Sequence, residues 1–238
     1  MTGHAENIPA RALNCLRQQS ELYGDELYLR DGNQWMKQLR NASGHHWTDL
    51  ETRIVHCKKC GLSAARKHAV PGCGSRQARL MLIGEAPGEE EDIRGKPFVG
   101  KAGQLLDKIL AAIEFDRDEV YIANILKCRP PQNRDPHPEE IACCLPYLWQ
   151  QIDLIRPGLI LALGRIAGQT LLESDDSLGK LRSDVHQYRS TPLMVTYHPA
   201  ALLRHPEWKK PVWEDVQQLR RYYDQYIGDK RPWNPPGK

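Results

Sequence analysis

The chain has 238 residues, 40% of them apolar, which suits one domain with a sizeable core plus an appended segment. It contains no apolar run of about 18 residues and no cationic leader followed by an apolar stretch, so we expect no membrane span, no secretion signal and a cytoplasmic location. The formal net charge of +3 permits contact with a polyanion without requiring it.

Residues 1–50 are polar and show little periodicity beyond a short helix expected at 10–23. We interpret them as an N-terminal extension of unknown role. The main domain is expected at 51–228, and the proline-rich end at 229–238 is expected to be a flexible tail.

Seven cysteines in a chain without a secretion signal favour metal or redox chemistry over a disulfide framework. Cys57 and Cys60 form a C-x-x-C pair, whose short spacer lets both sulfurs face one metal centre. Two further thiolates are needed to complete such a site. The alternative is a pair of buried thiols that bind no metal.

Four apolar runs predict buried strands, and helical patterns separate them. The segment at 129–138 contains four prolines and predicts a loop without regular structure. Pro138 and the acids after it are typical of the first turn of a helix. The expected strands lie at 78–83, 120–126, 158–164 and the first half of 192–203, and the expected helices at 48–55, 103–113, from 138, 165–173 and 207–226.

This alternation predicts an α/β fold, a three-layer sandwich with a central, mainly parallel four-stranded sheet and helices on both faces. Ligands of such sheets bind at the carboxyl ends of the strands. Glu85, Gly164 and His198 come after the first, third and fourth expected strands, and Asn124 stands at the end of the second. We therefore expect these residues to meet in one crevice.

One aromatic residue, Phe98, stands in the loop after the first strand, where packing gives no reason for it. A flat aromatic ring, an amide, an imidazole and a carboxylate are the groups needed to hold a planar heterocycle. Each of these residues alone has a commoner structural meaning: Asn124 as a cap, His198 as a loop residue, and the acidic run 89–92 as the first turn of a helix.

Four motifs together resemble the family 4 uracil-DNA glycosylases, a bacterial and archaeal family with an iron-sulfur cluster. They are GEAPGEEEDIRGKPFVGKAGQLLD at 84–107, NILKCRPPQNRDPHPEE at 124–140, GKLR at 179–182 and TYHPAALLR at 196–204. The resemblance extends from about Val55 to about Tyr226 and implies the uracil-DNA glycosylase fold. It leaves the N-terminal extension outside.

The resemblance implies a 4Fe-4S cluster held by Cys57, Cys60, Cys128 and Cys144. Cys143 is then a neighbour on the same helix and not a ligand. Zinc is the rival metal for four thiolates, but such zinc sites usually contain a second close cysteine pair.

The resemblance also implies that uracil flips out of DNA into the crevice, where its N-glycosidic bond is hydrolysed and an abasic site remains. Phe98 would stack on the base, Asn124 would bind its O4 and N3–H edge, and His198 would donate to O2. Ala86 stands where other glycosylase families have a catalytic Asp. Glu85 and Glu91 are both candidates for binding the base or orienting the catalytic water, and their spacing does not separate them.

The same resemblance implies contacts with single- or double-stranded uracil-containing DNA, made by basic residues around the crevice and by a leucine that fills the vacated stack. The alternative for the leucines is packing in the core. The candidates are Arg129, Arg134, Arg182, Leu202, Leu203, Arg204 and Lys209.

Three other functions stay open: a relative specific for another base such as hypoxanthine, a non-catalytic uracil-DNA binding iron-sulfur protein, and a protein that traps DNA covalently through a histidine, for which His137 is the candidate. We expect a monomer. Residues 19–23 also loosely resemble the peptides by which bacterial repair proteins bind the sliding clamp, although an amphipathic helix packed on the domain explains them as well.

Overall fold

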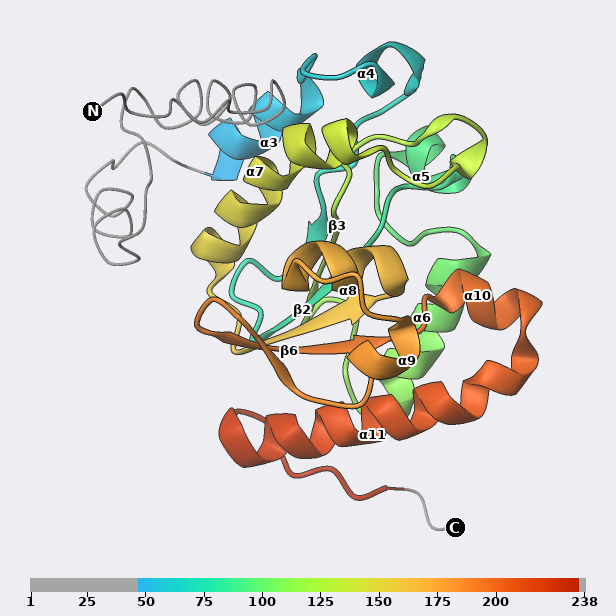
Figure 1. The fold of residues 1–238 in the computed structure, drawn as a ribbon. Coiled ribbons are helices and arrows are strands. Elements are labelled where there is room, and N and C mark those ends of the chain that lie inside the picture. Colours follow the sequence, from blue (N-terminus) through green and yellow to red (C-terminus); the bar gives the residue numbers. More distant parts are fainter. Residues whose placement is uncertain (1–46, 236–238) are drawn as a thin grey trace, which may run out of the picture.

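A computed structural model describes residues 47–235 and has a mixed six-stranded sheet at its centre (Figure 1). The spatial order is β1-β3-β2-β4-β6-β5. The four inner strands are parallel, and both edge strands pair antiparallel with their neighbours. The strands are β1 (Cys73–Gly74), β2 (Leu80–Gly84), β3 (Tyr121–Asn124), β4 (Leu159–Leu163), β5 (His186–Tyr188) and β6 (Thr191–Thr196).

The predicted α/β sandwich is confirmed, and its four parallel strands are the four expected apolar runs. The number of strands is corrected from four to six, because β1 and β5 extend the sheet at its two edges. These strands have two and three residues, which is too short for a recognisable alternation of apolar and polar residues.

Helices cover both faces of the sheet (Figure 1). Leu80 and Leu82 of β2 pack on the face covered by α6 and α11, whereas Met81 and Ile83 pack on the face covered by α7, α8 and α9. Successive strand residues point to opposite faces, so every position of β2 is buried. The longer helices are α6 (Lys101–Ala112), α7 (Pro138–Ile155), α8 (Arg165–Leu172) and α11 (Lys209–Tyr226), and the shorter segments are α3 (Trp47–Val55), α4 (Leu62–Ala65), α5 (Glu89–Arg94), η1 (Pro131–Asn133), α9 (Leu178–Leu181), α10 (Pro199–Arg204) and η2 (Pro206–Trp208).

Two loop segments have more regular structure than expected. The acidic run 89–92 begins α5, which is the helical alternative for that run. The proline-rich segment contains the single 3-10 turn η1, with Gln132 and Asn133 at positive φ.

The predicted start of α7 is confirmed: Pro138 is its first residue, and Glu140 accepts a hydrogen bond from the His137 amide at 2.8 Å.

The tail expected to be flexible packs against the domain as far as the structure describes it. Trp233 is only 9% exposed, its ring meets Trp213 edge to face at 5.9 Å, and its backbone amide donates to Asp224 at 2.9 Å. Trp233 and these contacts hold the described part of the segment after α11 against the domain.

In the described part of the chain, no helix is long and apolar enough to cross a membrane. The expected helix at 10–23, the clamp-like peptide at 19–23 and Cys15 lie outside the described residues.

Candidate active site

A cavity of about 340 Å³ opens at the carboxyl ends of the parallel strands. Residues at the carboxyl ends of three of these strands line it together with Phe98: Glu85 and His198 follow β2 and β6, and Asn124 is the last residue of β3. Gly164 lies close behind His198. The remaining lining comes from the loop after β2, from α5 and α6, from the segment 130–135 and from α10: Ala86, Pro87, Gly88, Glu91, Ala102, Pro130, Asn133, Arg134, Asp135, Ala200, Ala201 and Arg204.

The Phe98 ring is held in the cavity by a strained turn, since the residue has φ 50° in the left-handed region. Glu91 fixes this turn: its carboxylate accepts hydrogen bonds from the amides of Val99 at 2.8 Å, Gly100 at 2.9 Å and Gly88 at 3.1 Å. A Cβ at Gly103 would lie 1.9 Å from the Phe98 carbonyl oxygen, so only glycine allows α6 to approach this closely.

Asn124 supplies an acceptor without a partner. Its side chain is buried, and Oδ1 makes no hydrogen bond in the structure. A Cβ on Gly84 would come within 2.5 Å of this oxygen and within 2.8 Å of the Phe98 ring, so the amide and the ring share one small space. A buried acceptor without a partner costs free energy unless a ligand satisfies it, which favours a ligand with an N–H at this position.

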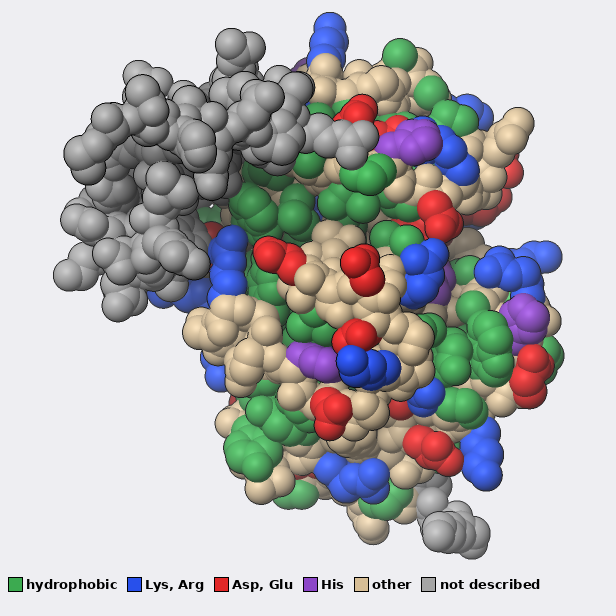
Figure 2. All heavy atoms as spheres, viewed as in Figure 1, with side chains coloured by type: hydrophobic (Ala, Val, Ile, Leu, Met, Phe, Trp, Pro, Cys, Tyr) green, Lys and Arg blue, Asp and Glu red, His purple; other side chains and the backbone are tan. Residues whose placement is uncertain are grey.

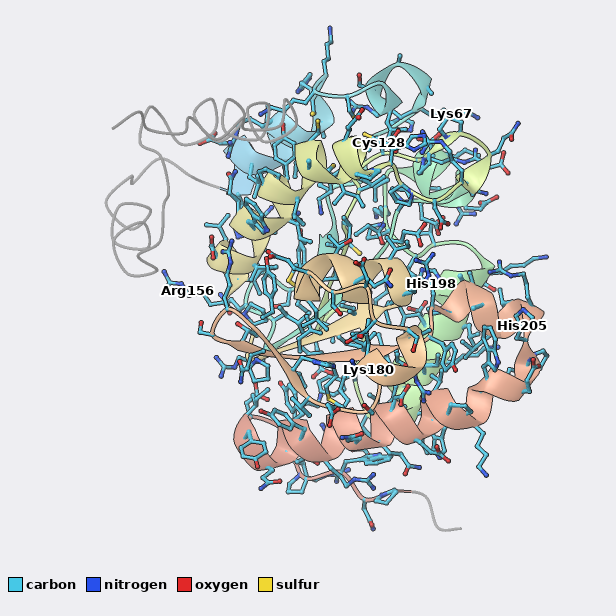
Figure 3. All side chains as sticks on the ribbon, viewed as in Figure 1. Lys67, Cys128, Arg156, Lys180, His198 and His205 are labelled. Carbon is cyan, nitrogen blue, oxygen red and sulfur yellow. The ribbon has the colours of Figure 1, made fainter. Side chains whose placement is uncertain are left out.

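His198 is held as a neutral donor. It is the N-cap of α10, and its Nδ1 accepts a hydrogen bond from the Ala200 amide at 3.1 Å. Burial, together with the nearby Arg204, lowers the pKa of His198 to about 4, against the opposing effect of Glu91. Neutral histidine with Nδ1 accepting carries its proton on Nε2, which leaves an N–H to donate. Figure 3 shows His198 near α8 and α10.

Glu85 is a carboxyl group that titrates near neutrality. Burial raises the pKa of Glu85 to about 7, and the Asp135 carboxylate raises it as well, whereas Arg165 lowers it. Arg165, at the start of α8, forms an ion pair with Asp135 at 3.1 Å. Sequence reasoning did not single out Asp135 or Arg165, because no motif marks either residue and only the fold brings them beside Glu85.

The basic residues expected to bind DNA have different surroundings. Arg134 lines the cavity and forms an ion pair with Glu140 at 2.6 Å, and Arg129 donates to Asn133 at 2.8 Å. The guanidinium of Arg182 is bound by both Asp215 oxygens, each at 2.8 Å, and stacks over Tyr197. Arg204 and Lys209 are exposed, and Arg204 also lines the cavity.

The structure separates the two candidate leucines. Leu202 is 2% exposed and belongs to the core beneath α10, so it cannot enter DNA in this conformation. Leu203, on the same helix, is 49% exposed. His137, the candidate for covalent trapping, is the N-cap of α7 and is not among the residues that line the cavity.

Four cysteines gather in a separate small core next to the sheet, formed by α3, α4 and α7. Burial raises the pKa of the Cys144 thiol to about 12, and the nearby Cys128 and Cys57 thiols raise it as well, against the effect of Lys127. Burial also raises the pKa of Cys60, and the nearby Cys128, Cys143 and Cys57 thiols raise it as well. Cys57 and Cys128 thus lie near both Cys60 and Cys144, and Cys143 lies near Cys60 as well.

Two of these sulfurs already accept hydrogen bonds. The Lys127 amide donates to Cys144 Sγ at 3.2 Å, and Arg66 donates to Cys128 Sγ at 3.0 Å. Cys143 instead directs its thiol at the Lys59 carbonyl oxygen, at 3.5 Å. Within residues 47–235, no group of three or more His, Cys, Asp or Glu side chains is arranged to hold a metal ion.

Comparison with known proteins identifies the superfamily of this chain. Residues 71–218 match the model of the uracil DNA glycosylase superfamily. A protein of Archaeoglobus fulgidus named Type-4 uracil-DNA glycosylase is 38% identical over 192 residues, which cover 77% of this chain and 94% of that protein. A protein of the same name from Sulfurisphaera tokodaii is 43% identical to this chain, and the match covers 78% of this chain and 92% of that protein. Another, from Saccharolobus solfataricus, is 45% identical, and the match covers 72% of this chain and 83% of that protein. The chain belongs to the uracil DNA glycosylase superfamily.

Proposed function

We propose that this protein is a uracil-DNA glycosylase of the iron-sulfur type, which removes uracil from DNA and leaves an abasic site for base excision repair. The observation that carries the proposal is the cavity at the sheet edge, in which an unsatisfied Asn124 oxygen, the Phe98 ring and a neutral His198 surround a space suited to one planar base. The similarity to proteins named Type-4 uracil-DNA glycosylase supports it.

Recognition of uracil rests on the edge of the base that Asn124 faces. The Asn124 oxygen accepts from N3–H of uracil, and the side-chain amide donates to O4, while Phe98 stacks on the ring. Cytosine has an acceptor at N3 and a donor at C4, so both hydrogen bonds would be lost. Each buried polar group left unpaired costs about 1 to 3 kcal/mol.

Cleavage of the N-glycosidic bond makes the sugar oxocarbenium-like and leaves negative charge on the base. His198 Nε2–H donates to the O2 atom on which this charge grows, a contribution of about 3 kcal/mol if it equals that of an oxyanion-hole donor. We assign the orientation of the attacking water to Glu85, because the Glu91 carboxylate already accepts three amide hydrogen bonds.

We infer that Cys57, Cys60, Cys128 and Cys144 hold a 4Fe-4S cluster. A cluster takes one thiolate on each iron, so its ligands need not converge on a single ion. The hydrogen bonds from Lys127 and Arg66 suit sulfurs that carry negative charge, and the donor set of four thiols fits the group. When bound, the cluster would act as a structural crosslink between the segment before β2 and the loop at 128–144.

The ligand set can be checked by the visible absorbance of the purified protein. We expect Cys144→Ser or Cys128→Ser to lose the cluster absorbance and most of the soluble protein. The matched control, Cys143→Ser, changes the adjacent residue and should keep both. Bleaching by Cys143→Ser alone would show that the ligand assignment is wrong.

The proposed activity is tested by uracil release from single-stranded and double-stranded oligonucleotides that contain one deoxyuridine. We expect free uracil and an alkali-labile abasic site from both, and no release of hypoxanthine or cytosine from matched oligonucleotides. Tight binding of uracil-containing DNA without release would identify a non-catalytic binding protein. A cytoplasmic location, a monomeric state and clamp binding through residues 19–23 stay predictions.

A further inference from the structure

A stack of rings stands directly after the helix that carries His198 and Leu203. Tyr197 stacks on Trp208 with ring centroids 4.8 Å apart and planes 28° apart, and His205 stacks on Trp208 at 4.3 Å and 23°. The Arg182 guanidinium lies 4.6 Å from the centre of the Tyr197 ring. Three aromatic rings and one guanidinium thus form a continuous stack at the junction of α10, η2 and α11.

The outer part of this stack is open to solvent. The side chain of His205 is 47% exposed, and Trp208 is half-buried. Figure 3 shows His205 at the outer end of the turn between α10 and α11. Packing in the core does not explain a half-exposed imidazole placed flat against an indole.

The stack is bordered by cations. Arg204, Lys209 and Lys210 are exposed on either side of it, whereas Glu207 is the one acidic residue between 203 and 210 and pairs with His205 at 3.3 Å. Figure 2 shows basic, histidine and hydrophobic side chains together on the side of the molecule where α10 lies, with an acidic side chain next to the histidine. Aromatic faces next to cations suit single-stranded nucleic acid, whose bases stack while its phosphates meet positive charge.

The distance from the cavity also fits DNA. α10 runs from Pro199, beside His198, to Arg204, and its six residues span about 9 Å. At about 3.4 Å per nucleotide along a strand, this corresponds to about three nucleotides. If the strand whose uracil lies in the cavity follows α10, it brings a nearby base to the level of His205.

We propose that His205, backed by Trp208, offers the outer face of this stack to one unstacked base of the DNA, about three nucleotides from the base in the cavity. The inference rests on the proposed function, because the uracil in the cavity sets the position of the strand. Leu203 and this surface together would keep the DNA open around the flipped nucleotide. Stacking does not read base identity, so the surface strengthens binding without adding sequence preference.

The test uses the full chain and oligonucleotides that contain 2′-fluoro-deoxyuridine, which binds without being cleaved. The fluorescent base 2-aminopurine is placed in turn at each of the positions on both sides of the uracil and on the opposite strand, in single-stranded and duplex forms. Its emission reports whether that base leaves the DNA stack and packs on a side chain. The position that responds identifies which strand supplies the base.

We expect one position to respond in the wild-type complex, and His205→Ala or Trp208→Ala to remove that response and weaken DNA binding about tenfold. Two controls should keep the response: Tyr226→Ala, which removes a 64% exposed ring at the other end of α11, and Glu207→Gln, which keeps both stacked rings. Thermal melting shows whether Trp208→Ala folds, and if it does not, the exposed His205→Ala decides.

The two proposals fail in different ways. If wild-type protein releases uracil from ordinary deoxyuridine oligonucleotides but the variants respond and bind as wild type does, the stacking surface is wrong and the glycosylase function stands. If wild-type protein releases no uracil, the catalytic function fails, and the 2-aminopurine response of the uncleaved complex still decides the stacking surface.

Discussion

His198 and Glu85 line the same cavity but have different protonation states at neutral pH. Burial and Arg204 keep the imidazole neutral by lowering its pKa to about 4, so it is a hydrogen-bond donor through Nε2 at any pH in the physiological range. Burial and Asp135 raise the pKa of Glu85 to about 7, so this carboxyl is the group whose ionisation changes there. His198 therefore donates its hydrogen bond throughout the physiological pH range, whereas the charge of Glu85 changes within it.

Replacing His198 by alanine should lower the single-turnover rate of uracil release about a hundredfold while DNA affinity stays nearly unchanged. The reason is that the donor acts mainly on charge that is present in the transition state. Rapid-quench measurement of uracil release and a binding titration separate the two effects. His56→Ala, at the surface beyond α3, is the matched control. A single-turnover rate like that of the wild type would remove the assigned role.

The pH profile should show one ionisation near 7 that belongs to Glu85. If Glu85 orients water as a carboxylate, the rate rises as pH increases through about 7. Asp135→Asn removes a negative neighbour, lowers the pKa of Glu85 and moves the rise to lower pH. Arg165→Gln removes a positive neighbour and moves it to higher pH. Single-turnover rates across this range test the signs, and a rise that neither substitution moves would assign the ionisation to another group.

The sequence predicts the residues of the cavity that stand at strand ends, because a parallel sheet places those ends together. Glu85, Asn124 and His198 are of this kind. The charged residues that shift the pKa of Glu85 could not be predicted. Asp135 comes from an irregular loop, and Arg165 is the first residue of α8, which follows β4 in the chain. Whether Leu202 or Leu203 faces solvent also depends on the rotation of α10, which a helix of six residues does not reveal by periodicity.

At the scale of elements, the contact between the Phe98 turn and α6 is the feature that shapes the cavity. Gly103→Ala should lower the stability by about 1 to 3 kcal/mol, because the added Cβ would lie 1.9 Å from the Phe98 carbonyl oxygen and the turn must move. The displaced ring should also slow uracil release about tenfold or more. This loss overcomes the better helix propensity of alanine, which is worth only about 1 kcal/mol.

Gly61→Ala is the matched control, since a Cβ at Gly61 meets nothing within 4 Å and its φ of −59° suits any residue. Urea denaturation and single-turnover uracil release are measured for both variants. Equal stability and activity of the two variants would mean that the Phe98 turn adapts without cost. The sequence marks Phe98 as unusual, but the need for glycine at 103 follows only from how closely α6 approaches the turn.

At the scale of the whole molecule, the helices α3 and α4 of the cysteine core lie at one end, while the described tail runs along α11 at the other (Figure 1). The loop that lines the cavity at 130–135 starts directly after Cys128, so the cysteine core supports one wall of the site. None of the residues that line the cavity belongs to the tail. Stability and activity are therefore separable for changes in the tail.

Trp233→Ala should lower the free energy of unfolding by about 3 kcal/mol, because it removes a nearly buried aromatic side chain and leaves a cavity beside Trp213. The same segment supplies the Arg231 carbonyl oxygen that accepts from the buried Arg220 at 2.6 Å. A loosened tail would therefore leave that guanidinium with Asp224, at 3.3 Å, and without the carbonyl acceptor.

Urea denaturation at 25 °C measures the change, and uracil release well below the unfolding midpoint should equal that of the wild type. Asn234→Ala, at the exposed next position, is the matched control and should change neither quantity. An unfolding midpoint of Trp233→Ala equal to that of the wild type would mean that the tail contributes no stability in solution. The prediction of a flexible tail, made from its proline-rich composition, would then be correct.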